Sequence, residues 1–393
     1  MDKETFMDGV SWIDRLDFKL STGTSGNSGL GPYAYWTLAD NSEPYGGEPT
    51  LSISDPGNPE LTWETQQKTT IGIDARIWKK FGVNLEFYHR LTTNMMMEVP
   101  YPLTTGFSFN YKNVGSYLNR GIDLRLDYDL WSDTHGNMAS IYGILNYNTD
   151  KVIELFQGLQ TWPMPNSYLL YKVGEPVTFF MPIFKQINPD SGDPEWYLPN
   201  EGDLSSTQMD DTKISVGNEF NEKALMQNTG IPRNTPYSGG FGFYGKYAGI
   251  SLQADFSYYI GKHIISKDLL YSENPKRYPN NNFSRNGLDY WKQPGDHVHL
   301  PDIKRYTTLT QTDTRILQNA SFCRLKNLTV GYELSHSLLE RQDFLTGAKV
   351  SLIGRNLLTF TRFKGPDPEP GGHIAYGRNP ASKQLMIGLE LRF

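Results

Sequence analysis

The sequence has little that would tie it to disulfide, metal or nucleic-acid chemistry. Cys323 is its only cysteine, which excludes an internal disulfide and a cysteine-based metal cage. Its 37 lysines and arginines are outnumbered by 43 aspartates and glutamates, so the net charge of −6 provides no basic surface for nucleic acid. Fingerprints of serine hydrolases, zinc proteases, P-loop proteins and dinucleotide-binding enzymes are also missing, and we expect a protein that is not an enzyme.

Long apolar runs are missing as well. No segment approaches the ~18 consecutive apolar residues of a transmembrane helix, although strands that alternate in polarity could still cross a bilayer. The first residues, MDKETFMDGV, are acidic where a secretory signal has a basic region and an apolar core. As written, the sequence is therefore expected to be cytoplasmic or to be the later part of a longer exported protein.

Aromatic residues and glycine are abundant, with 24 tyrosines and 37 glycines, a mixture typical of strand-rich proteins. The final segment, 384–393, alternates strictly between apolar and polar side chains, as a strand with two unlike faces does. Its apolar side consists of Leu385, Ile387, Leu389, Leu391 and Phe393. All-β structure is the first expectation.

The same alternation recurs along the chain. It is clear in 71–77, 83–88, 122–130 and 250–260, and weaker in five further segments, which are 15–21, 138–148, 239–247, 326–334 and 348–356. Runs of about 9 to 11 residues fit what a tilted strand needs to cross a bilayer. The pattern therefore predicts a series of membrane-crossing strands.

Connection lengths separate two interpretations. Short links such as KKFG and YAG join some strands, whereas 25–68, 93–118, 152–237 and 262–320 are long. Short turns at one end and long loops at the other are typical of an outer-membrane barrel, and compact soluble domains rarely carry such loops. The alternative is a soluble or surface β-sandwich that binds carbohydrate, in which the alternating faces would meet in a dry core.

The polar side of 122–130 is expected to face the lumen of the barrel. It carries Asp123, Arg125, Asp127 and Asp129. These carboxylates could be read as the paired acids of a glycosidase, but solvated charges on a channel wall, partly paired with Arg125, are favoured. At the end of the sequence, Phe393 follows an apolar strand. It is interpreted as a signal that a barrel-assembly machine recognises by strand addition.

Five segments together resemble one family. They are FMDGVSWIDRLDFKLSTGTSGNSGL (6–30), NVGSYLNRGIDLRLDYDL (113–130), YWKQPGDHVHLP (290–301), NASFCRLKNLTVGYELS (319–335) and GRNLLTFTRFKGPDPEP (354–370). Each is similar to a motif of SusC/RagA-type TonB-dependent outer-membrane transporters, and they follow in the family's order from residue 6 to the last strand. The resemblance covers the whole chain.

The resemblance implies a nutrient importer of the Gram-negative outer membrane. Members form a plugged transmembrane barrel of about 22 strands, of which this chain would supply roughly the last 10 to 12 together with their long extracellular loops. A SusD-like lipoprotein would cap it, TonB would open it, and oligosaccharides or peptides would be the cargo. The signal peptide, TonB box, plug domain and first strands would lie upstream, so residues 1–393 are expected to be the C-terminal part of the barrel, embedded in outer-membrane lipids.

Candidate substrate contacts are aromatic and polar residues of the long segments. Aromatic rings stack on sugars or receive peptide side chains, and asparagine supplies hydrogen bonds. The candidates are Tyr33, Tyr35, Trp36, Trp162, Trp196, Tyr197, Asn281, Tyr290 and Trp291. The alternative is that these residues hold the loops to one another or to the lipoprotein.

No cofactor or metal is expected. His297 and His299 lie near Asp296, but they lack a third ligand of the kind zinc requires. The acidic stretch 190–203 contains hard oxygen ligands, yet its spacing misses a calcium-binding loop. A solvated acidic loop is the simpler interpretation.

Overall fold

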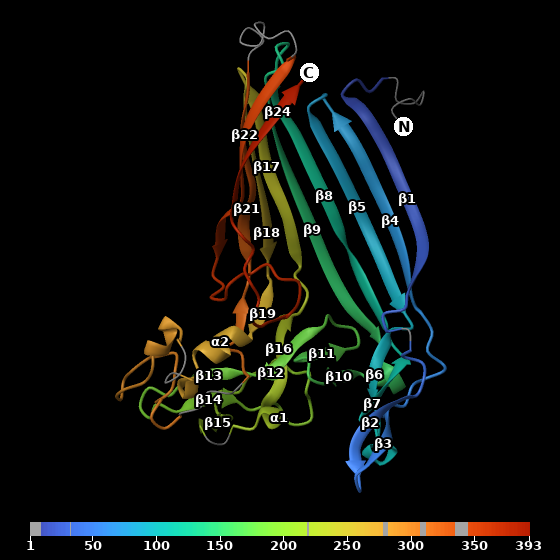
Figure 1. The fold of residues 1–393 in the computed structure, drawn as a ribbon, viewed down its shortest axis with the longest axis vertical. Coiled ribbons are helices and arrows are strands. Elements are labelled where there is room, and N and C mark those ends of the chain that lie inside the picture. Colours follow the sequence, from blue (N-terminus) through green and yellow to red (C-terminus); the bar gives the residue numbers. More distant parts are fainter. Residues whose placement is uncertain (1–8, 32, 218–219, 278–281, 307–311, 335–344) are drawn as a thin grey trace.

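A single antiparallel sheet of ten strands dominates the computed structural model (Figure 1). The structure describes residues 9–31, 33–217, 220–277, 282–306, 312–334 and 345–393. Strands that follow one another in the sheet order are hydrogen-bonded neighbours. In that order they are β1 (Ile13–Asn27), β4 (Glu64–Ile77), β5 (Phe81–Thr93), β8 (Ser116–Ser132), β9 (Met138–Glu154), β17 (Tyr237–Tyr247), β18 (Ile250–Ile260), β21 (Phe322–Glu333), β22 (Gly347–Thr361) and β24 (Gln384–Arg392).

Tight hairpins join strands at one end of the sheet. Between β17 and β18, Ala248 and Gly249 have φ angles of 49° and 82°, the left-handed pair of a type I′ turn whose twist matches the strands. Between β4 and β5, Trp78 and Lys79 have φ angles of 52° and 58°. The short links predicted at these two places are confirmed.

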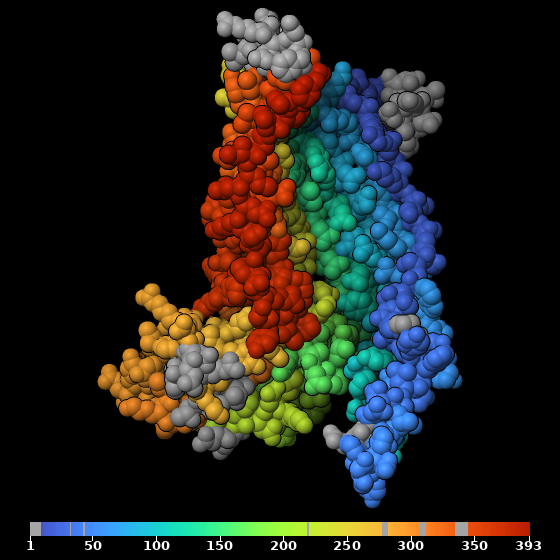
Figure 2. All heavy atoms as spheres, in the orientation of Figure 1, coloured from blue at the N-terminus to red at the C-terminus, as the bar shows by residue number. Residues whose placement is uncertain are grey.

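The sheet is strongly curved, and its two edge strands stand apart. β1 and β24 are the first and last strands of the sheet order, and within the described residues each pairs with a strand of this sheet on one side only. Figure 2 looks into the hollow between β24 and β1. Arg392, at the end of β24, and Ile13, at the start of β1, both lie at the hairpin end.

One face of the sheet is apolar and exposed. Leu385 and Ile387 are 73% and 81% exposed, so no second sheet of the described residues covers them, and the sandwich alternative is wrong. Large apolar side chains continue across neighbouring strands on this outer face, among them Leu20, Ile71, Phe87, Leu252, Val330 and Leu352. The predicted fold class is confirmed: the chain forms the C-terminal portion of a transmembrane antiparallel β-barrel wall.

The opposite face is polar and cross-linked. Arg125 pairs with Asp127 at 2.7 Å, Asn146 donates a hydrogen bond to Asp123, and Arg76 pairs with Asp129. These partners come from different strands except in the Arg125 pair, so the polar face is held by side chains as well as by the backbone.

The long connections fold into small sheets at the other end of the strands, seen below the barrel strands in Figure 1. Two of them are hairpins, β2 (Leu38–Tyr45) with β3 (Glu48–Asp55) and β6 (Met96–Pro100) with β7 (Phe109–Asn113). A four-stranded sheet contains β10 (Thr161–Met164), β11 (Leu169–Lys172), β12 (Thr178–Pro182) and β16 (Met226–Pro232). Of two three-stranded sheets, one contains β13 (Phe184–Ile187), β14 (Pro194–Tyr197) and β15 (Ile214–Val216), and the other contains β20 (Leu317–Asn319), β19 (His263–Ser266) and β23 (Ile374–Ala375). The helices are short: α1 (Glu222–Leu225), α2 (Lys267–Ser272), η2 (Leu103–Thr105), η3 (Phe156–Gly158), η5 (Pro275–Arg277) and η6 (Arg285–Leu288).

The principal hydrophobic core lies in this loop region. Phe179 and Met181 of β12 are fully buried and pack with Val152, at the end of β9, and with Ile265 of β19. Because this core ties several connections together, the loops form a layer across the ends of the strands. Among the described residues, no helix is both long enough and apolar enough to cross a membrane.

Candidate functional site

A polar cavity of about 680 Å³ lies where the polar face of the sheet meets the loop layer. Its lining combines arginines, amides and tyrosines from β5, β8, β9, β11 and β18 and from the connections on either side of them. The lining residues are Tyr88, Arg90, Met95, Tyr117, Asn119, Asn146, Asn148, Tyr171, Val177, Arg233, Asn234, Thr235 and Tyr259.

The register of the strands places the cavity on the lumen side. Tyr88 and Arg90 of β5 are two residues apart and therefore share a face, and Tyr88 lies opposite Gly121 of β8. Asn146 of β9 lines the cavity and donates to Asp123. The cavity is thus continuous with the predicted lumen wall.

Gly121 allows a close crossing of side chain and backbone beside the cavity. A Cβ at this position would lie 2.1 Å from the carbonyl oxygen of Tyr147 and 2.4 Å from the Tyr88 hydroxyl. Without it, the Tyr88 ring crosses β8 and its hydroxyl donates to Asn148 Oδ1 at 2.8 Å. Gly121 is the second glycine of the segment NVGSYLNRGIDL, and this close crossing explains why the motif has a glycine there.

A buried carboxylate organises the floor of the cavity. Asp150 is 6% exposed and accepts hydrogen bonds from the Tyr117 hydroxyl at 2.6 Å and from the backbone N–H of Val177 at 3.1 Å. Asn234 donates in turn to the Tyr117 oxygen at 2.9 Å. These bonds fix β8, β9 and the connection that follows β16 against one another.

The side chains that line the cavity are suited to binding. Amide side chains donate and accept hydrogen bonds, guanidinium groups attract anions, and tyrosine rings provide flat apolar surface. Within the described residues, no group of three or more histidine, cysteine, aspartate or glutamate side chains is placed to hold a metal ion.

Two of the tryptophans predicted to contact substrate are core residues. Trp196 is fully buried, and its Nε1–H donates to the Asp313 carboxylate at 2.8 Å. Trp162 is 5% exposed and packs edge-on against Phe156, with ring centroids 5.1 Å apart. Neither ring lies on a surface that a substrate could reach, because the loops fold over their own aromatic residues.

Three further predicted contacts hold loops in place. Trp291 donates from Nε1 to the carbonyl of Pro189 at 2.8 Å, and the Tyr197 hydroxyl donates to Asp211 at 3.1 Å. The Nζ of Lys292 lies 4.9 Å from the ring centroid of Tyr290. Trp291 thereby ties the segment YWKQPGDHVHLP to the connection between β13 and β14.

Tyr33, Tyr35 and Trp36 remain available as predicted substrate contacts. Their side chains are exposed, and the Trp36 ring centroid lies 5.7 Å from that of Tyr33 and 5.5 Å from that of Tyr35. Asn281 lies outside the described residues. Tyr33, Tyr35 and Trp36 do not line the polar cavity.

Ionisable groups of the loops are paired. Burial raises the pKa of the Tyr306 phenol to about 12, helped by its hydrogen bond to Asp193 at 2.7 Å. Burial also raises the pKa of Asp193, but hydrogen bonds from Ser191 and Tyr306 and the charge of Arg305, 2.9 Å away, outweigh it and the net pKa is lowered. His299, considered above as a metal ligand, lies 3.1 Å from Glu273.

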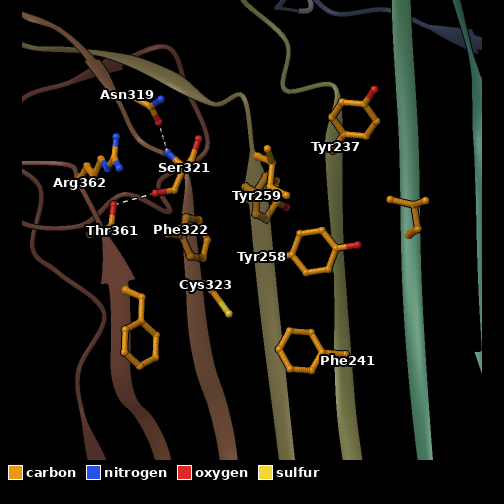
Figure 3. Close-up of a pocket in the computed structure, with 13 residues that line it drawn as sticks. Tyr237, Phe241, Tyr258, Tyr259, Asn319, Ser321, Phe322, Cys323, Thr361 and Arg362 are labelled. Atoms are coloured by element: carbon orange, nitrogen blue, oxygen red, sulfur yellow. Dashed lines mark hydrogen bonds between the residues drawn. The ribbon is translucent and has the colours of Figure 1, made fainter.

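A second cavity, of about 800 Å³, opens at the loop end of β17, β18, β21 and β22 (Figure 3). Phe241 and Tyr258 point into it, and Cys323 and Phe360 also line it. The Tyr258 hydroxyl donates to the carbonyl of Ile144 at 3.0 Å, so this ring is fixed against the sheet. Phe241 and Phe360 belong to the exposed apolar residues, which distinguishes this crevice from the polar cavity.

The arginines of the polar cavity are absent from the residues predicted from sequence. Arg90 continues the alternation of 83–88 onto the polar face, and this was a usable signal. Arg233 lies in a connection, where no periodicity indicates which way a side chain points.

Comparison with known proteins was made on sequence and on structure. No family model matches the chain. TonB-dependent receptor P39 of Formosa agariphila is 22% identical over 442 residues, covering 100% of this chain and 42% of the receptor. TonB-dependent receptor SusC of Bacteroides thetaiotaomicron is 23% identical, covering 100% of this chain and 39% of that protein.

Solved structures of a RagAB peptide transporter agree closely. One has a TM-score of 0.85 and 34% sequence identity over 98% of this chain and 42% of the matched chain. Another, in an open-open state, has a TM-score of 0.83 and 33% identity over 99% of this chain and 41% of its match. The chain therefore spans less than half of the length of the relatives it matches.

A curved wall with an apolar outer face, a charged inner face and an internal binding cavity defines part of a transmembrane β-barrel. Together with these similarities, it identifies the family. The chain belongs to the SusC/RagA family of TonB-dependent receptors.

Proposed function

We propose that the complete protein is an importer of the Gram-negative outer membrane that takes up peptides and depends on TonB. The observation that carries the proposal is the polar cavity on the lumen face, in a wall that is 34% identical to a RagAB peptide transporter. Peptide is favoured as cargo because Asn119 and Asn148 line the cavity with amides that match the donors and acceptors of a peptide backbone.

The remainder of the barrel and a plug domain are part of this proposal. β1 and β24 each leave a row of backbone donors and acceptors that, in a bilayer, must be paired. Further strands joining these edges would satisfy them and close the barrel around the lumen. TonB would act through the missing part, and a SusD-like lipoprotein would cover the loop layer from outside.

Oligosaccharide is the second candidate cargo. The exposed cluster of Tyr33, Tyr35 and Trp36 favours it, because clustered rings at a surface can stack on sugar faces. This cluster lies in the connection between β1 and β4, outside the polar cavity.

The test is uptake by cells that carry or lack the complete gene. We expect cells with the gene to accumulate a labelled short peptide, and the accumulation to stop when TonB is deleted or a protonophore is added. Accumulation of a labelled oligosaccharide in place of the peptide would support the second cargo. If cells that lack the gene take up the peptide and the oligosaccharide as well as cells that carry it, the proposal of an importer would be overturned.

A further inference from the structure

The lumen face beside the polar cavity carries positive charges that lack negative partners. Arg90 and Arg233 line the cavity, and Lys68 of β4 lies directly opposite Arg90 in the strand register. None of the three takes part in the ion pairs of the described residues, whereas Arg76 and Arg125 on the same face both do. The positive charges at the cavity thus differ from Arg76 and Arg125, whose charges are paired.

The opposition of Lys68 and Arg90 is unfavourable by itself. Like charges placed directly opposite on neighbouring strands repel each other, and a sequence free to vary could relieve the repulsion with one acidic residue. The nearest carboxylate in the register is Asp150, opposite Asn119. Its Oδ2 accepts from Tyr117 and Val177, and among the described residues it forms no ion pair with Lys68, Arg90 or Arg233. An anion that enters the cavity would relieve the repulsion.

Arg90 is also incompletely bonded. Its Nε is buried and has no hydrogen-bond partner among the described residues. Its guanidinium carbon lies 4.6 Å from the centroid of the Tyr88 ring, which holds the group against the strand surface. A buried guanidinium N–H without an acceptor is costly unless a ligand supplies the acceptor.

Arg233 approaches from the loop side of the cavity. Its Nη1 donates to Asn234 Oδ1 at 3.0 Å, and its backbone N–H donates to the carbonyl of Val177 at 2.9 Å, so the chain that carries it is fixed. The side chain is exposed, so the rest of its guanidinium fork is accessible to a ligand. Two forks on one cavity suit the planar, two-oxygen geometry of a carboxylate.

We infer that Arg90 and Arg233 bind a carboxylate of the peptide cargo, either its free C-terminus or an acidic side chain. The inference rests on the proposed function and adds a substrate class to it: acidic peptides in preference to neutral or basic ones. Asn119 and Asn148 are placed to bind the adjoining backbone, and Lys68 strengthens the local positive potential.

The test measures binding to the complete transporter purified in detergent. One probe is a short labelled peptide with glutamates and a free C-terminus; its matched partner has glutamines and an amidated C-terminus. We expect the acidic peptide to bind at least tenfold more tightly, since charge-assisted hydrogen bonds are the strong ones. Arg90→Gln and Arg233→Gln should each remove most of this difference while leaving binding of the amidated peptide unchanged.

Arg125→Gln is the control variant, because Arg125 lies on the same face and is already paired with Asp127. It should keep the full preference for the acidic peptide. Equal affinity for the two peptides in the unaltered protein would overturn the inference and leave peptide import standing. Arginine-dependent binding of a uronic-acid oligosaccharide with no binding of either peptide would overturn both the inference and peptide as cargo.

Discussion

At the scale of single residues, two of the motifs that identify the family hold distant parts of the chain together. Arg324, from NASFCRLKN, is 3% exposed and pairs with Asp367 and Glu369, both from GPDPEP, at 2.6 Å each. Lys326 also pairs with Glu369. Two motifs distant in sequence therefore form one ion-pair network that holds the last long connection against β21.

Removing Arg324 should be far more damaging than removing an exposed arginine. Arg324→Ala would leave two carboxylates near each other with the buried one unpaired, and such a loss costs about 3–5 kcal/mol of unfolding free energy. Arg125→Ala breaks a pair whose arginine is about half exposed and should cost less than about 1 kcal/mol. Chemical unfolding of the complete protein in detergent measures both free energies. Equal losses in the two variants would contradict a structural role for the Arg324 ion-pair network.

The same ion-pair network makes the stability of the protein depend on pH. Burial raises the pKa of Asp367, but hydrogen bonds from Arg324 and from the backbone N–H groups of Ala381 and Glu369 outweigh it, so the folded-state pKa is lowered. A lowered pKa stabilises the fold above the unfolded value of about 3.9, and this contribution disappears as the pH falls through the folded pKa.

The Asp367→Asn variant should therefore be less stable at neutral pH and lose less stability below about pH 4 than the unaltered protein does. Unfolding midpoints measured across this range provide the check, with Asp190→Asn, an exposed aspartate, as the control. Parallel curves for Asp367→Asn and the unaltered protein would show that the carboxylate is not coupled to folding.

Residue-level prediction from sequence was weakest for the substrate contacts. The aromatic character of Trp162 and Trp196 favours substrate contact. Whether such a ring faces outward, however, depends on contacts between segments far apart in the chain, such as the one between Trp196 and Asp313. Arg90 and Arg233 stand out only because they lack an ion-pair partner among the described residues, and such a lack is visible only in three dimensions.

At the scale of elements, the strands of the main sheet were predictable and the small loop sheets were not. A strand such as β8 spans 17 residues, so its alternation repeats many times. Strands such as β15 and β20 span three residues and are too short for a period to show. β20 is held by non-local packing, because its Leu317 belongs to the buried core around Phe179 and Met181, and β15 is held by its pairing with β14.

Close packing between β5, β8 and β9 gives a test at this scale. Gly121→Ala should push the Tyr88 ring away, break its bond to Asn148 and cost roughly 1–3 kcal/mol by overpacking. Gly143→Ala, on β9, meets nothing within 4 Å and should be nearly neutral. Thermal midpoints of the two variants compare them, and similar midpoints would mean that the crossing at Gly121 is not required.

At the scale of the whole molecule, everything depends on which face of the sheet meets lipid. The apolar face was predictable from alternation, and the structure confirms that it is exposed and uncovered within the described residues. The cavity on the other face could not be foreseen, because it forms where strands of the main sheet meet β11 and the connection after β16, which are distant in sequence.

Leu252 and Gln253 provide the most direct measurement. They are neighbours on β18, at nearly the same height, with Leu252 on the apolar face and Gln253 donating to Asp255 on the polar face. Spin labels would be attached to Leu252→Cys and Gln253→Cys, each in the Cys323→Ser background, in the complete protein in bilayers. We expect the label at 252 to collide with oxygen dissolved in lipid and the label at 253 to collide with a water-soluble nickel chelate. The reverse pattern, or equal access of the chelate to both labels, would contradict the membrane wall.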